Sequence, residues 1–163
     1  MAGVDDGGGG GGGGVATATA DDYRAWEEYK SRVDRENFSD DLFKRVRNDM
    51  RLQLYYRMAN QAFQQGQQNY GIGEHFDAYV FLKRAALLLG HIIPRHNAYR
   101  TAAYAPDMRR GRRTLATALE HAEAARAALK EEYVGRRVEA REAAAGGGRG
   151  GGGGGGAGDD GAA

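Results

Sequence analysis

The chain has 163 residues, no cysteine and a formal net charge of +1, from 23 basic and 22 acidic residues. The lack of cysteine excludes disulfides and thiolate metal sites, and the charge balance argues against a dedicated nucleic-acid binder. No segment approaches the roughly 18–20 apolar residues that cross a bilayer, and the first residues lack the basic-then-apolar pattern of a secretory signal. We therefore expect a cytoplasmic protein with at most peripheral membrane association.

Glycine runs occupy both ends of the chain, at 7–14, 146–148 and 150–156. Glycine loses the most backbone entropy on folding and has no side chain to bury. We expect residues 1–20 and 144–163 to be disordered. The chain between them is enough for one small domain, whose thin core makes association with itself or a partner favourable.

Residues 21–37 are predicted to form a short amphipathic helix. Asp21 or Asp22 is a suitable N-cap, and three apolar residues recur on one side. These residues are Trp26, Tyr29 and Val33. The polar segment 37–40 then interrupts the helix.

A second helix is predicted from about Asp41 to Gln68. Apolar residues recur at spacings of three and four, which defines one helical face. They are Phe43, Val46, Met50, Leu54 and Met58. Gly66 weakens the last turns, and 71–73 forms the turn that follows. The Gly-x-Gly in this turn lacks the preceding strand that a phosphate-binding loop requires.

The third predicted helix, residues 74–92, is apolar around most of its circumference. Only Lys83 and Arg84 interrupt the apolar surface in its middle. Such a helix is buried on several sides, so we expect it to be central, between neighbours that include those of a second subunit. Pro94 ends it. A homodimer formed partly by this helix is therefore expected.

The last helix is predicted to restart at Asp107, after Pro106, and to continue to about Gly135. The alternating charges of 136–142 indicate a solvated helical end. Residues 109–113 carry four arginines around Gly111. This basic run has two interpretations: a solvated helix start, or a contact to acidic protein or lipid headgroups.

No catalytic or metal-binding pattern is present. The four histidines, at 75, 91, 96 and 121, form no close pair of the kind that zinc sites use. The two serines lie outside any nucleophile elbow, and the carboxylates are scattered among opposite charges. We expect no enzyme activity, no metal and no cofactor.

Tyr55, Tyr56 and Arg57 form the most distinctive local cluster. Adjacent residues of a helix point to different faces, so one tyrosine would pack in the core and the other at a surface or an interface. Core packing of the cluster without an interface role is the alternative.

Several features in order resemble one known family. They are Tyr55-Tyr56-Arg57 followed by an apolar residue and alanine, the tract 77–84, and Ile93-Pro94-x-His96 with Tyr99 three residues on. This pattern is similar to the dimerisation domain at the N-terminus of an endosomal ubiquitin-specific protease. It is also similar to the equivalent MIT-like domain of AMSH-type deubiquitinases, especially those of plants.

The resemblance implies a small antiparallel all-α bundle of the atypical MIT type within 38–143, with three main helices and the short N-terminal helix beside them. It further implies binding of a C-terminal helical motif from ESCRT-III-type proteins, or dimerisation, on endosomes. Eight residues are the candidates for partner binding or dimerisation: Tyr55, Tyr56, Arg57, Tyr79, Lys83, Arg84, Leu88 and His96. Lys83 and Arg84 are expected at the rim of the groove that takes the helical motif.

Two other interpretations stay open at this point. The chain is either an adaptor that stands alone or a truncated product of a zinc-dependent deubiquitinase gene, since no His-x-His follows the helical segment. A tetratricopeptide-like fragment is the second alternative. It is disfavoured because the apolar pattern does not recur at a fixed period.

Overall fold

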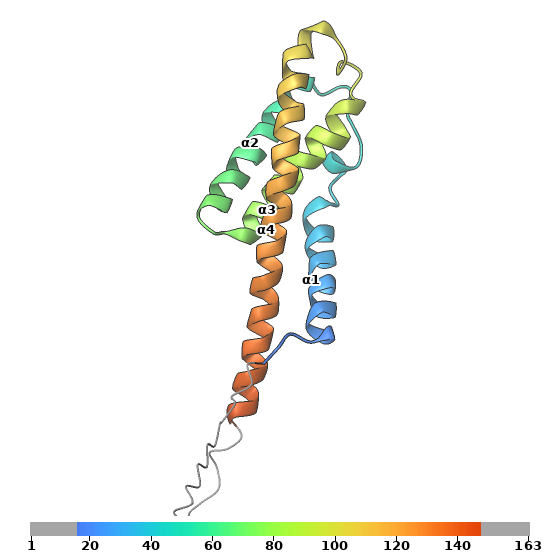
Figure 1. Ribbon diagram of the computed structural model, residues 1–163. Helices are drawn as coiled ribbons and strands as arrows, with labels where there is room; N and C mark the ends of the chain where they lie inside the picture. The colour runs from blue at the N-terminus through green and yellow to red at the C-terminus, as the bar shows by residue number, and fades with distance from the viewer. Residues whose placement is uncertain (1–15, 148–163) are drawn as a thin grey trace, which may run out of the picture.

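The computed structural model describes residues 16–147, which are helical almost throughout (Figure 1). The elements are α1 (Ala20–Phe38), η1 (Asp41–Phe43), α2 (Leu52–Gly71), α3 (His75–Leu87), a π-helical turn η2 (Leu88–Ile92), η3 (Ile93–Arg95), η4 (Ala102–Tyr104) and α4 (Ala105–Gly146). No strand occurs in this part of the chain, which confirms the predicted all-α bundle. The glycine-rich segments 1–15 and 148–163, predicted to be disordered, lie outside the described residues.

The long helix α4 is the axis of the bundle. Figure 1 shows α2 and α3 packed as a hairpin beside the half of α4 that comes first in the chain, and α1 beside its later half. Within these described helices, none has the length and apolar character that a membrane span requires.

The predicted central position of the third helix is confirmed. Six residues of α3 are buried: Ala78, Tyr79, Val80, Leu82, Ala85 and Ala86. Val33 and Phe38 of α1, Phe63 of α2, and Ala122 and Ala125 of α4 pack against this set. These covering elements belong to the same chain, while Phe76 at the start of α3 remains 39% exposed.

The predicted helix 41–68 is wrong at its start. Residues 44–51 are not helical, and α2 begins only at Leu52. Tertiary hydrogen bonds hold this segment: the Arg47 amide donates to the Tyr55 hydroxyl at 2.9 Å, and the Asn97 amide donates to the Asn48 side chain at 2.9 Å. Apolar residues of the segment still pack on the core from the loop, so their helical spacing misled the prediction.

The last helix is longer than predicted, because α4 runs without interruption over 42 residues. It starts at Ala105, with Pro106 in its first turn, where the missing N–H does no harm. It ends at Gly146, beyond the predicted end near Gly135 and the predicted domain limit at residue 143.

The predicted solvated helical end at 136–142 is helical and exposed at every residue except Val138, but two of its arginines also bind a buried carboxylate. Asp22 is 2% exposed, and its carboxylate accepts from Arg137 at 3.1 Å and from Arg141 at 2.7 Å. Asp22 is not the N-cap of α1. Thr19 is, in a capping box completed by the Asp22 side chain. The hydrogen bonds of Asp22 with Thr19, Arg137 and Arg141 therefore hold the start of α1 against the C-terminal part of α4.

Gly66 allows α2 and α3 to approach closely. A Cβ atom at this position would lie 2.6 Å from Leu82 Cγ and 3.0 Å from the Leu82 backbone nitrogen. The glycine that looked like a weak point in the sequence is therefore needed for the tightest contact of the hairpin. Gly73, with φ of 79°, supplies the left-handed residue of the α2–α3 turn.

We predict that Gly66→Ala destabilises the chain by about 1–3 kcal/mol, because overpacking outweighs the gain of roughly 1 kcal/mol in helix propensity. Gly71→Ala is the matched control, since a Cβ there meets nothing within 4 Å. Urea unfolding of both variants measures the difference. Equal stability of the two alanine variants would show that the helices separate without loss.

Asp22 makes the stability of the folded chain depend on pH. Hydrogen bonds from Arg141, Thr19 and Arg137 hold the pKa of this carboxyl well below its ordinary value of 3.8. A lowered pKa in the folded state stabilises the chain fully above about pH 4, and the contribution is lost as pH falls further. Asp22→Asn should therefore lower the Tm at neutral pH, and its difference from the wild type should shrink in acid. Asp21→Asn, at the exposed neighbour, is the control; a Tm difference for Asp22→Asn that is independent of pH would contradict this account.

Candidate functional site

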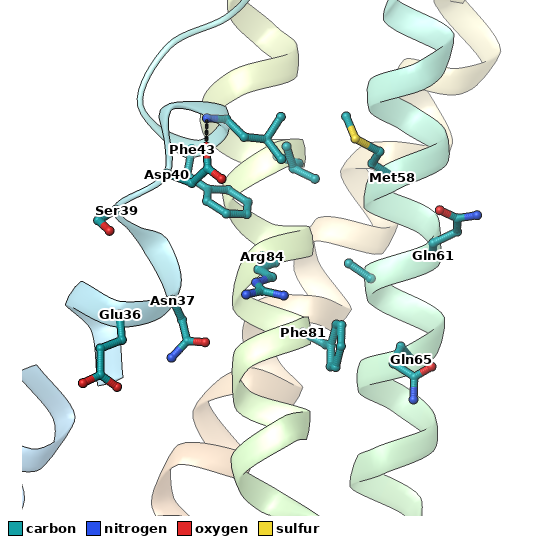
Figure 2. A pocket seen from close by; sticks show the side chains of 13 residues that line it. Glu36, Asn37, Ser39, Asp40, Phe43, Met58, Gln61, Gln65, Phe81 and Arg84 are labelled. Carbon is teal, nitrogen blue, oxygen red and sulfur yellow. Dashed lines mark hydrogen bonds between the residues drawn. The ribbon is translucent and has the colours of Figure 1, made fainter. Parts of the chain in front are cut away.

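A groove lies between α2 and the segment joining α1 to η1, with α3 as its floor (Figure 2). Its volume is about 780 Å³. Apolar side chains and a polar rim share its surface. The apolar lining residues are Leu42, Phe43, Met58, Ala62, Phe81 and Leu88, and the polar ones are Glu36, Asn37, Ser39, Asp40, Gln61, Gln65 and Arg84. We call it the η1–α2 groove.

Local sequence explains the wall formed by η1. Asp40 has extended backbone and caps the single turn of η1, its carboxylate accepting from the Leu42 amide at 3.0 Å. This turn places Leu42 and Phe43 against the helices as partly buried side chains, next to Leu88 of the core. The predicted second helix is interrupted after η1, and this interruption allows η1 to form one wall of the groove.

Arg84 is the cation of the groove. Figure 2 shows its side chain between Asn37 and Phe81, and its guanidinium carbon lies 5.6 Å from the centre of the Phe81 ring. Its Nε is buried and has no hydrogen-bond partner among the described residues. A buried donor without a partner is unfavourable, and Arg84 also forms no ion pair within the described residues.

Lys83, the predicted companion of Arg84 at the rim, lies on another face. Its ammonium group contacts the Asp34 carboxylate at 2.9 Å and the Tyr79 hydroxyl at 3.0 Å, and lies 4.7 Å from the Phe38 ring centre. The Tyr79 hydroxyl donates to Asp34 at 2.8 Å. Burial, followed by this carboxylate, raises the pKa of Tyr79. The Lys83 cluster therefore joins α3 to α1 within the chain.

A second, smaller recess of about 200 Å³ lies where α1, α3 and α4 meet. Leu119 on its edge is 51% exposed, which is unusual for a leucine beside a packed helix pair. Charges of both signs surround it. Its lining residues are Lys30, Tyr79, Lys83, Ala86, Leu119, Ala122, Glu123 and Arg126. We call this surface the Leu119 face.

Four other predicted residues form one buried cluster. Tyr55, Tyr56, Leu88 and His96 are all 6% exposed or less, whereas Arg57 is exposed on α2. His96 accepts from the Ala98 amide at Nδ1, so its Nε2 carries the proton and donates to the Met50 carbonyl at 2.8 Å. The expectation that one tyrosine of the pair reaches a surface is not met in the folded chain, because both are core residues.

Tyr56 differs from Tyr55 in its hydroxyl group. The Tyr55 hydroxyl accepts from the Arg47 amide, whereas the Tyr56 hydroxyl is buried without a partner among the described residues. Burial raises the pKa of Tyr56 to about 12. The ring stacks on Tyr104 with centres 6.4 Å apart. Tyr56 thus supports the start of α4, at the end of the bundle away from α1.

The sequence reasoning missed most of the groove. Phe43 and Met58 were assigned to one helical face, although they approach the groove from different elements. Leu119 keeps helical spacing with Leu115 and Ala122 in the sequence, which is typical of a buried position, yet it is 51% exposed. The signal that could have located the groove is the polar break 37–40, since a break between helices lets the chain fold back over its neighbours.

Nothing in the described part of the chain brings together three or more metal-ligating side chains. The geometry is that of a helical-bundle domain whose surface recesses are bounded by helices. The comparison with family models identifies it further: the USP8 dimerisation domain matches residues 26–135. The chain therefore belongs to this family, which confirms the resemblance seen in the sequence. No match was found among curated proteins or among solved structures.

Proposed function

We propose that the chain is a non-catalytic interaction module that binds an amphipathic helix in the η1–α2 groove. The observation that carries this proposal is Arg84, a cation without an ion-pair partner in the described residues, beside apolar side chains of the groove. A helix with apolar residues at i, i+3 or i+4, and i+7 fills such a groove. An acidic residue on the helix would pair with the guanidinium.

The proposed ligand is the C-terminal helical motif of an ESCRT-III-type protein, which would place the chain at endosomal membranes. Support comes from family membership and from the apolar lining of the groove beside Arg84. Lys83 is engaged with Asp34, so the role first assigned to the Lys83–Arg84 pair falls to Arg84. Arg57 lies exposed on α2 and is a candidate for a contact outside the groove.

We further propose that the chain forms a homodimer through the Leu119 face. The family name describes dimerisation. Leu119 is the exposed apolar residue next to the α3–α4 packing, and α3 contributes Tyr79, Lys83 and Ala86 to the same recess. A two-fold axis through this face would bring the same recess of both copies together, so that each Leu119 lies against the partner's copy of the face.

The groove assignment predicts the effect of reversing one charge. Wild-type chain should bind ESCRT-III tail peptides with a Kd on the order of micromolar. Arg84→Glu should weaken binding at least about tenfold, because a charge-assisted hydrogen bond is lost. Arg136→Glu, on the exposed side of α4, is the matched control and should bind like the wild type.

Titration of peptides into labelled protein measures this, with circular dichroism to verify that each variant is folded. Lack of binding by any peptide below the millimolar range would overturn the groove assignment. So would equal affinity for the wild type and a folded Arg84→Glu variant.

The dimer assignment predicts a contrast between two exposed leucines. Leu119→Arg should convert the dimer to a monomer at tens of micromolar, the order at which modest interfaces assemble, because a charged side chain would replace the apolar one at the contact. Leu54→Arg changes a leucine of similar exposure, 41%, on another side of the bundle and should leave the dimer intact. Light scattering measures both. A monomeric wild type, or a Leu119→Arg variant that remains dimeric, would refute this interface.

A further inference from the structure

Charge is concentrated in one segment of a nearly neutral chain. Residues 91–113 contain six arginines and one acidic residue, with no lysine or glutamate. The arginines are Arg95, Arg100, Arg109, Arg110, Arg112 and Arg113. The segment therefore carries a formal charge of +5, while the complete chain carries +1. The balance of the whole chain conceals this local excess.

The fold gathers these arginines at one end of the bundle. They lie on η3, on the turns before η4 and on the first turns of α4, at the end of α4 opposite Gly146 (Figure 1). All six side chains are exposed. Asp107 pairs with Arg110 at 2.6 Å, and the other five make no ion pair within the described residues. We call this surface the arginine end.

Gly111 explains how the start of α4 presents its charges. A Cβ at this position would lie 3.2 Å from the Tyr56 ring and 3.3 Å from a Leu89 methyl group, so this side of the helix faces the core. The flanking arginines at 109, 110, 112 and 113 consequently spread around the outer side of the helix. Because Gly111 packs against the core, the four neighbouring arginine side chains lie on the solvent-exposed side of α4.

The shape of this end selects the kind of partner. None of these arginines lines the η1–α2 groove or the Leu119 face. A peptide or a small anion binds best in a recess, whereas exposed charges spread over one end of a bundle fit an extended charged surface. Guanidinium groups also form bidentate hydrogen bonds with phosphate.

We propose that the arginine end binds the surface of a bilayer that carries anionic phosphate headgroups. The contact is peripheral and electrostatic. It does not use the η1–α2 groove or the Leu119 face, whose lining residues belong to other parts of the bundle. The proposed membrane contact can therefore be tested independently of the proposed peptide binding and the proposed dimer.

Co-sedimentation of the full chain with vesicles tests the proposal. Vesicles of phosphatidylcholine containing phosphatidylserine should bind the chain, and vesicles of phosphatidylcholine alone should not. Binding should weaken as salt shortens the range of electrostatic attraction. The triple variant Arg109→Gln, Arg112→Gln, Arg113→Gln should bind roughly a hundredfold less, since each basic residue near an anionic bilayer contributes about a factor of five.

The matched control is Arg24→Gln, Arg35→Gln, Arg136→Gln, which removes the same charge from exposed positions on α1 and the later half of α4. It should retain binding to within a few fold of the wild type, a change of less than about 1 kcal/mol. Equal loss in both triple variants would overturn the proposal. Binding to neutral vesicles, or tighter binding to RNA than to anionic vesicles, would do the same.

Discussion

The architecture depends on covering α3, a 13-residue helix that is apolar around most of its circumference. In a domain of this size, burying such a helix requires neighbours on several sides. Three helices of the chain pack against α3: α2, which a tight turn connects to it, the long helix α4, and the end of α1. The closest of these contacts is the α2–α3 pair at Gly66, where a side chain would collide with Leu82.

The way α3 is covered determines where recesses remain. After α1 the chain forms the short turn η1 and does not continue directly into α2. A groove lined by Phe81 and Arg84 remains between η1 and α2. On another side, α1 and α4 close around Tyr79 and Lys83 but leave Leu119 at the edge. The arginine end lies apart from both recesses. One bundle thus presents three separate surfaces, for each of which a different kind of partner is proposed.

Sequence reasoning predicted the helical class, the family and the central helix, because these depend on periodicity and on a spaced motif. It could not place residues whose roles depend on tertiary contacts. Residues 44–51 keep helical apolar spacing yet are held by Tyr55, His96 and Asn97 from distant positions. Adjacent Lys83 and Arg84 looked like one rim, but neighbouring helix residues point in different directions, and only Arg84 reaches the groove. Asp22 looked like a cap, because its partners Arg137 and Arg141 lie more than a hundred residues away.

The central claim is that the η1–α2 groove, with Arg84 at its floor, is the site that takes a helical ligand. Mapping of amide and methyl chemical shifts in isotope-labelled protein, during addition of an acidic amphipathic tail peptide, tests it most directly. The account predicts that the perturbed signals cluster at Leu42, Met58, Phe81 and Leu88, and that Leu119 and the arginine end are unchanged. Perturbations centred on Leu119 or on residues 91–113, with the groove silent, would contradict it.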